Sequence, residues 1–188
     1  AAIYVRQADK VFITLPEGTT NILSGGDSYE SLDDNHIDGI IFAKSDLVIN
    51  GAGSLFVTAV TGHGIVSKDD LKVTGGSITV TASGHGLSGK DSVRIGGGTL
   101  SADSTQTADS MESANPMKAA DSTKAADFMN ESGAAVPSLH ITSGKDGIHS
   151  ENADKEDKRF IYIAGGSITI DSEGDCISAD AYLQIDGG

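Results

Sequence analysis

The stretch His63–Gly84, HGIVSKDDLKVTGGSITVTASG, decides the fold because its pattern returns along most of the chain. A small residue and an apolar one, Gly64-Ile65, precede a polar corner, and a short alternating run lies on each side of the pair Gly75-Gly76. Alternation of Ile and Val with a period of two is typical of a strand with one buried face. We expect the buried side chains to include Ile65, Leu71, Val73, Ile78, Val80, Ile148, Ile163, Ile168 and Ile170.

Small residues followed by an apolar one mark the later copies of this unit. The markers are Gly39, Gly64, Gly86, Gly147 and Cys176, with a weaker copy at Ser110 in the longest gap, where Asp109–Asn115 superposes on Asp146–Asn152. A base period of about 22 residues suits a solenoid whose coils stack at the spacing of strands, about 4.8 Å. The sequence therefore predicts an all-β fold, a right-handed, single-stranded parallel β-helix of about six or seven coils.

The domain organisation follows from where the spacing departs from this period. We expect one β-helix domain over residues 1–188, opened by an entry or capping coil at 1–37 that has a single strand. The extra residues at 116–135 and 153–159 fall at one corner of the coil, which predicts two protruding loops. The first is expected to be either a short helix or a low-complexity loop. A start without Met and an end inside the repeat predict a trimmed fragment.

Charge restricts the partners. The chain has 13 Lys and Arg against 27 Asp and Glu, a net charge of −14. Nucleic acid and anionic membrane surfaces are therefore poor partners unless cations intervene. No run of eighteen apolar residues occurs, so membrane insertion is not expected. We expect a monomer.

Stacking would align polar residues into two columns at the corners. One column is Asp38, His63, His85, Asp109, Asp146 and Asp175, and the other is Asp69, Asp91, Asn115 and Asn152. Carboxylates one strand apart repel unless a proton or cation lies between them, and hard oxygen ligands suit Ca²⁺. Asp and Asn also hydrogen-bond turn amides, which is the alternative we favour for the second column. At the loop-bearing corner we expect calcium, held by Asp146, Asp175, Glu151, Asn152, Asp154 and Asp180.

His63 and His85 replace Asp in the first column. We expect polar corner residues rather than transition-metal ligands, because no Cys, Asp or third His is placed with them at the spacing of a zinc site. Cys176 is expected to be a small buried side chain rather than a nucleophile.

Outward strand positions are the candidate ligand surface. The first alternating run gives Val48, Lys72, Arg94, Tyr162 and Gln184, and the second gives Phe56, Thr79, His140 and Thr169. A flat sheet face with cations, amides and a tyrosine suits an extended polysaccharide, and an ordinary solvated face is the alternative. The expected glycan contacts are Lys72, Arg94, Tyr162 and His140.

Five phrases resemble a bacterial family of secreted carbohydrate-binding β-helix proteins of the clostridial cell-surface type. They are DGIIFAKSDLVINGAGSL (38–55), HGIVSKDDLKVTGGSITV (63–80), GKDGIHSEN (144–152), FIYIAGGSITI (160–170) and GDCISADAYLQIDGG (174–188). The resemblance implies a right-handed parallel β-helix with bound calcium, similar in shape to pectate lyases. It also implies binding of cellulose or pectin-type acidic glycans outside the cell or at the bacterial surface.

Three functions follow as hypotheses. The first is a non-catalytic, calcium-containing module that binds plant cell-wall or other acidic glycans. The second is a polysaccharide lyase, in which calcium neutralises a uronate and a Lys or Arg removes the C5 proton. Lys145 and Lys155 adjoin the acidic corner, but carboxylates favour a charged lysine, which opposes a base role. The third is a structural spacer in a longer surface protein.

Overall fold

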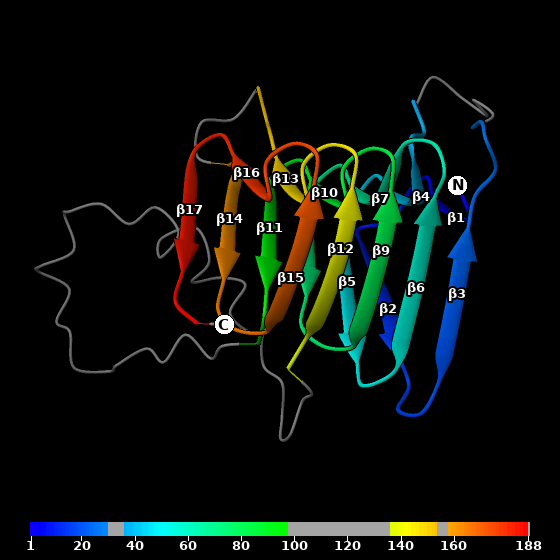
Figure 1. The fold of residues 1–188 in the computed structure, drawn as a ribbon, viewed down its shortest axis with the longest axis horizontal. Coiled ribbons are helices and arrows are strands. Elements are labelled where there is room, and N and C mark those ends of the chain that lie inside the picture. Colours follow the sequence, from blue (N-terminus) through cyan, green and yellow to red (C-terminus); the bar gives the residue numbers. More distant parts are fainter. Residues whose placement is uncertain (30–35, 98–135, 154–157, 188) are drawn as a thin grey trace, which may run out of the picture.

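The computed structural model describes residues 1–29, 36–97, 136–153 and 158–187, which form strands and turns without a helix. The chain climbs one sheet, crosses the top through a second and descends through a third while it advances along the axis (Figure 1). This path is a right-handed superhelix, as expected for parallel strands joined by crossovers. The predicted parallel β-helix is confirmed.

Three parallel sheets form its sides. Sheet A contains β1 (Ile3–Val5), β4 (Gly39–Ala43), β7 (His63–Ser67), β10 (Leu87–Gly89), β13 (Ile148–Ser150) and β16 (Ile177–Ala179). Sheet B contains β2 (Lys10–Leu15), β5 (Asp46–Gly51), β8 (Asp70–Val73), β11 (Ser92–Ile95), β14 (Phe160–Ile163) and β17 (Tyr182–Ile185). Sheet C contains β3 (Thr20–Ser24), β6 (Ser54–Ala59), β9 (Ser77–Ala82), β12 (Ser138–Ser143) and β15 (Ser167–Ser172).

Aliphatic ladders fill the space between the sheets. In sheet C, Leu55, Ile78, Leu139 and Ile168 pair in register across four strands, and the first three are buried. The polar residues between them point outward, since successive side chains leave opposite faces of a strand. The alternation predicted from the sequence therefore has the correct register, with Ile168 and Ile170 only partly buried near the end of the stack.

The marker glycines exist because no side chain fits where one coil passes under the next. A Cβ on Gly86 would lie 2.3 Å from a methyl of Ile141 and 2.7 Å from the Gly147 carbonyl oxygen. Gly64 and Gly147 have the same surroundings. Cys176 takes this position in the last coil that the structure describes, where no further coil covers it, and the side chain is exposed. The expectation that Cys176 is buried is therefore wrong.

The weak coil expected around Ser110 lies outside the described residues. β10 pairs directly with β13, through Leu87 and Ile148, and β11 pairs directly with β14. The coils on the two sides of residues 98–135 are thus immediate neighbours, and the predicted column residues Asp109 and Asn115 lie outside the described residues. The expected insertion at 116–135 lies outside the described residues, as does most of the one at 153–159.

The first coil is more complete than predicted. Residues 3–24 contribute β1, β2 and β3, which pair with β4, β5 and β6 in all three sheets. Alternation is short in β1, which made it hard to detect from the sequence. Within the described ranges, no helix has the length and apolarity needed to span a bilayer.

Candidate functional site

The outer face of sheet C is a broad exposed surface of hydroxyl side chains. Its three ladders are Ser54, Ser77, Ser138 and Ser167; then Phe56, Thr79, His140 and Thr169; then Thr58, Thr81, Thr142 and Asp171. Most of these side chains are exposed, including His140. In Figure 1 this sheet faces the viewer, with β6, β9, β12 and β15 side by side.

An open groove of about 520 Å³ follows the carboxyl ends of these strands. The third ladder lines it together with turn residues that include Ser83, Ser143 and Glu173. No Lys, Arg or aromatic residue is among the lining residues, and Asp171 and Glu173 place two acidic groups at one end. The groove therefore offers hydroxyl and carboxylate oxygens, which suit a ligand rich in hydroxyl groups.

Sheet B does not supply the exposed cationic platform that we expected. Lys72 pairs with Arg94, and Arg94 with Tyr162, so they do share one outward column. However, Lys72 is only 1% exposed and Arg94 only 7%. The Arg94 guanidinium lies 4.9 Å from the ring centroid of Phe160. Alternation predicts which face of a strand a side chain leaves, but it does not predict what packs over that face.

Tyr162 is half-buried on the same face. Its hydroxyl donates a hydrogen bond to Asp186 Oδ2 at 3.0 Å, and burial followed by this carboxylate raises the pKa of the phenol. Of the four predicted glycan contacts, only His140 lies exposed on sheet C.

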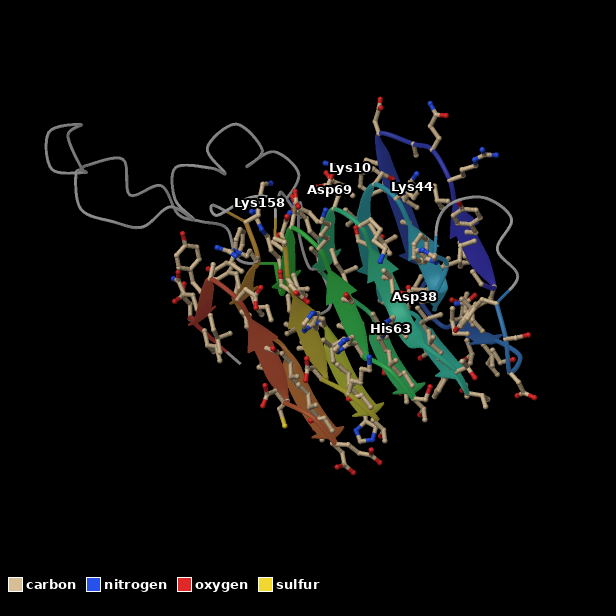
Figure 2. All side chains as sticks on the ribbon, turned by 90° about the horizontal axis from the view of Figure 1, so that it is seen from above. Lys10, Asp38, Lys44, His63, Asp69 and Lys158 are labelled. Carbon is tan, nitrogen blue, oxygen red and sulfur yellow. The ribbon has the colours of Figure 1, made fainter. Side chains whose placement is uncertain are left out.

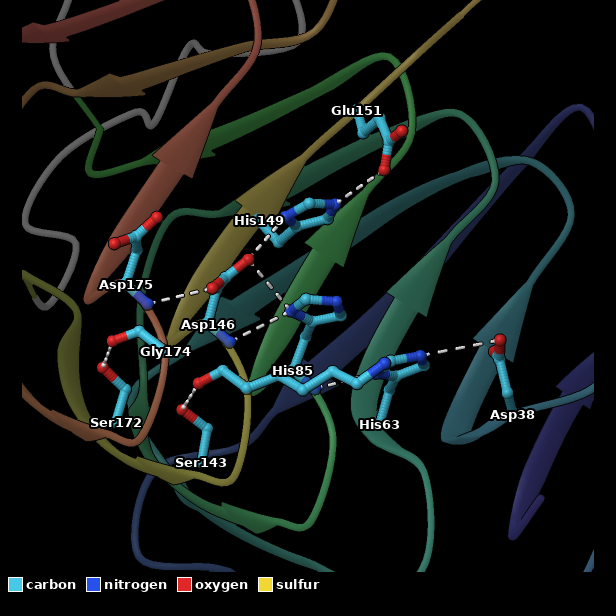
Figure 3. Close-up of polar contacts among 11 residues, drawn as sticks. Asp38, His63, His85, Ser143, Asp146, His149, Glu151, Ser172, Gly174 and Asp175 are labelled. Atoms are coloured by element: carbon cyan, nitrogen blue, oxygen red, sulfur yellow. Dashed lines mark hydrogen bonds and ion pairs between the residues drawn. The ribbon is translucent and has the colours of Figure 1, made fainter.

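Side chains at the turns between sheets C and A form an amide ladder, seen in Figure 3. His63 Nδ1 accepts the amide N–H of His85 at 2.8 Å, and His85 Nδ1 accepts that of Asp146 at 3.2 Å. Asp146 Oδ1 in turn accepts the amide of Asp175 at 2.9 Å. Each side chain thus holds the backbone of the next coil, which explains why His and Asp exchange in this column.

A ring nitrogen that accepts a hydrogen bond carries no proton, so His63 and His85 are neutral in this arrangement. Burial, followed by the neighbouring His149 and His63, lowers the pKa of His85 to about 4. Burial also lowers the pKa of His63, against the opposing effect of Asp38, whose Oδ2 lies 3.6 Å from His63 Nε2.

His149 completes what we call the histidine corner, namely His63, His85, Asp146 and His149. Its ring stacks on His85 with centroids 4.2 Å apart and an interplanar angle of 14°, and His85 stacks on His63 at 4.8 Å. Asp146 Oδ2 lies 2.9 Å from His149 Nδ1 and 3.4 Å from His85 Nδ1. An Asp and a third His therefore do accompany His85, contrary to the expectation from the sequence.

The sequence contained a signal for this corner. Aligning HGLSG (85–89) directly with DGIHS (146–150) places Asp146 and His149 in the coil next to His85, as the pairing of Ser88 with His149 shows. The interpolated coil at Ser110 hid this adjacency.

The predicted calcium ligands do not form one cluster. Asp146 and Asp175 precede β13 and β16, whereas Asn152 and Asp180 follow these strands at the other end of sheet A. Glu151 turns back to His149, and Asp154 lies outside the described residues. At Asp146, one carboxylate oxygen accepts an amide and the other faces imidazoles, so this corner does not fit an ion that needs six to eight oxygens.

A different group of carboxylates lies at the turns between sheets A and B. Oxygens of Asp69, Asp70 and Asp91 lie within 4.8 Å of one another, and we call these three residues the acidic corner. Figure 2 shows Asp69 and Lys158 at this corner, away from Asp38 and His63. Burial, the hydrogen bond with Asp91 and nearby carboxylates raise the pKa of Asp69 to about 6. A shared proton therefore relieves part of the repulsion between these groups.

Donors from two coils surround the acidic corner. Ser92 Oγ donates to Asp70 Oδ1 at 2.7 Å, Asn152 Nδ2 donates to Asp91 Oδ1, and Lys158 Nζ lies 3.4 Å from Asp91 Oδ2. Asp70 and Asp91 are 3% and 2% exposed. Oxygen ligands from adjacent coils, one with a raised pKa, fit a hard cation better than Asp146 does.

Comparisons with known proteins agree with this architecture. A family model described as "Carbohydrate-binding domain-containing protein" matches residues 1–133 and 119–188. A relative of that description from Acetivibrio thermocellus is 43% identical over 84 residues, which are 44% of this chain and 29% of the relative. The chain thus spans less than a third of that relative's length.

A similar solved structure is described as a polysaccharide lyase-like protein from C. thermocellum, in a gadolinium derivative. It has a TM-score of 0.66 and 28% identity, and the match covers 97% of this chain and 68% of that chain.

Proposed function

Because this chain belongs to the family of carbohydrate-binding domain-containing proteins, we propose that it is a non-catalytic polysaccharide-binding module whose sheet C face holds an extended glycan. One observation carries the proposal: hydroxyl ladders repeat on an exposed face across four adjacent strands. Plant cell-wall and other extended polysaccharides occur outside the cell, so we place the module in the extracellular space or at the bacterial surface.

The ladders suit a long ligand because they run along the solenoid axis with a repeat of about 4.8 Å. An extended glycan is also a one-dimensional repeat of hydroxyl groups, and Ser and Thr can both donate and accept hydrogen bonds. Ile22 and Phe56, 73% and 41% exposed, provide an apolar area beside them for the face of a sugar ring. Regular polar contacts and a small apolar area favour binding of a glycan through many weak, repeated subsites.

Charge favours a neutral glycan such as cellulose over a polyuronate. The groove lining contains acidic groups and no cation, and the protein carries a net charge of −14. A polyuronate would be repelled unless a cation intervened. Of the two substrate classes expected from the sequence, the geometry therefore supports the neutral one better.

We further propose that calcium stabilises the coil stack at the acidic corner rather than at Asp146. The ion would be held by carboxylate oxygens of Asp69, Asp70 and Asp91, where above pH 6 it would relieve the repulsion that a proton relieves at lower pH. Its role there would be structural, because the corner lies between sheets A and B and away from the sheet C groove.

The lyase remains a second candidate because the similar solved structure is described as polysaccharide lyase-like. Two assays separate the functions. Retention on insoluble cellulose without new absorbance from unsaturated product on polygalacturonate supports the binding module. Product absorbance that grows with time and enzyme concentration identifies a lyase, and absence of both retention and product leaves the structural spacer.

A further inference from the structure

The histidine corner brings three metal-ligating atoms together on adjacent coils. His85 Nδ1, Asp146 Oδ2 and His149 Nδ1 meet at separations of 3.4 Å and 2.9 Å from the carboxylate oxygen. Ligands about 2.0–2.1 Å from a tetrahedral zinc ion lie about 3.3 Å apart. We infer that His85, Asp146 and His149 form a site for a divalent transition metal ion of the zinc type.

The donor set selects this class of metal. Two imidazoles and one carboxylate are borderline ligands that zinc, cobalt and nickel accept, whereas calcium requires a shell of oxygens. Three protein ligands leave one tetrahedral position for water. The three side chains are each only 15–17% exposed. An ion can therefore reach the site from solvent and would be partly shielded from solvent once bound.

Glu151 supplies the partner that a ligating histidine usually has. Its Oε2 lies 3.4 Å from His149 Nε2, on the side of the ring opposite Asp146. Once an ion occupies Nδ1, this carboxylate can accept the proton on Nε2 and fix the orientation of the ring. On binding, the proton that His149 Nδ1 shares with Asp146 moves to Nε2, where Glu151 accepts it, so the ring stays neutral and Nδ1 can bind the ion.

Two local contacts must change for the ion to bind. His85 Nδ1 now accepts the Asp146 amide at 3.2 Å, the longest of the three rungs described above, so a metal displaces the weakest of them. The stacked rings of His85 and His149 must also splay, because a metal binds near the plane of each ring. Both rings are half-buried, His85 at a turn and His149 on the outer side of β13, which leaves this rotation open.

The test begins with protein freed of metal by chelation and dialysed, then titrated with zinc by calorimetry in the presence of excess calcium. We expect one equivalent of zinc to bind and to raise the melting temperature. Cobalt, used as a spectroscopic probe, should give the intense visible bands of a tetrahedral site, and zinc should displace it. Failure of the wild type to bind either ion stoichiometrically would overturn the inference.

Matched variants locate the site. His149→Ser copies the residue that Ser88 and Ser178 provide at the same register position, so the coil should still fold. It should weaken zinc binding by more than about 100-fold, and Glu151→Gln by about 10–100-fold. His140→Ala, on the exposed face of sheet C, is the control and should bind like the wild type. Unchanged affinity in His149→Ser, or an equal loss in His140→Ala, would show that the metal binds elsewhere.

Discussion

At the scale of single residues, His and Asp are interchangeable in the amide ladder because a neutral imidazole nitrogen and a carboxylate oxygen both accept an N–H. They differ in how they respond to acid. Protonating His85 removes the acceptor for the Asp146 amide, and protonating Asp146 weakens an acceptor for the Asp175 amide. The corner therefore depends on pH through identifiable atoms.

The first prediction concerns His85. Its pKa falls from about 6.5 in the unfolded chain to about 4 in the native protein, so the native state binds fewer protons. Its contribution to stability is fully present above pH 6.5 and is lost as the pH falls through 4. His85→Asn keeps an acceptor but cannot titrate. Denaturant unfolding with chelator present should show that the variant loses less stability than the wild type between pH 7 and 4, by on the order of 1–2 kcal/mol. Equal losses would contradict the proposed role of the ring.

The second prediction concerns calcium at the acidic corner. The raised pKa of Asp69 stabilises the native state only while Asp69 holds its proton, and this contribution is lost as the pH rises through 6. At pH 7.5 the ionised Asp69 therefore lowers the free energy of unfolding. Calcium at a hundredfold excess over its dissociation constant should add about 2.7 kcal/mol. Thermal unfolding with calcium and with chelator should differ in the wild type and much less in Asp91→Asn. Asp146→Asn should keep the calcium response, and a loss of it there would return the ion to Asp146.

At the scale of elements, the coil period depends on close contacts between backbones at the marker glycines. Gly86→Ala should lower the free energy of unfolding by about 1–3 kcal/mol, because the new methyl group meets Ile141 and the Gly147 carbonyl. Gly165→Ala is a matched control, since a Cβ there has no atom within 4 Å. Urea unfolding measures both. Similar stabilities of the two variants would mean that the marker column is not closely packed.

Strands, their register and the inward ladders could be predicted from the sequence because alternation and glycine position are local properties of the chain. Leu71, Ile78 and Val80 are buried as expected. Lys72 and Arg94 were placed on the correct face but not at the correct exposure, since alternation predicts the face of a side chain and not its neighbours there, such as the Phe160 ring beside Arg94. The histidine corner was missed for a similar reason, because residues distant in sequence become neighbours only when the coil order is known.

At the scale of the whole molecule, the three sides of the solenoid have different properties. The histidine corner and the acidic corner lie at the two ends of the sheet A strands. Sheet B buries its outward cations Lys72 and Arg94, and sheet C presents exposed hydroxyl ladders beside an open groove. A long glycan aligned with the axis can contact every coil of sheet C, so its affinity should grow with chain length through added subsites.

Retention on insoluble cellulose tests most directly whether sheet C is the glycan surface. Phe56 and His140 stand in one ladder of sheet C, whereas Phe12 is a more exposed ring on sheet B, at 59% against 41% for Phe56. We expect Phe56→Ala combined with His140→Ala to reduce the retained fraction at least about fivefold, with little change in melting temperature, and Phe12→Ala to be retained like the wild type. Full retention of the double variant, or its loss in Phe12→Ala instead, would contradict the account.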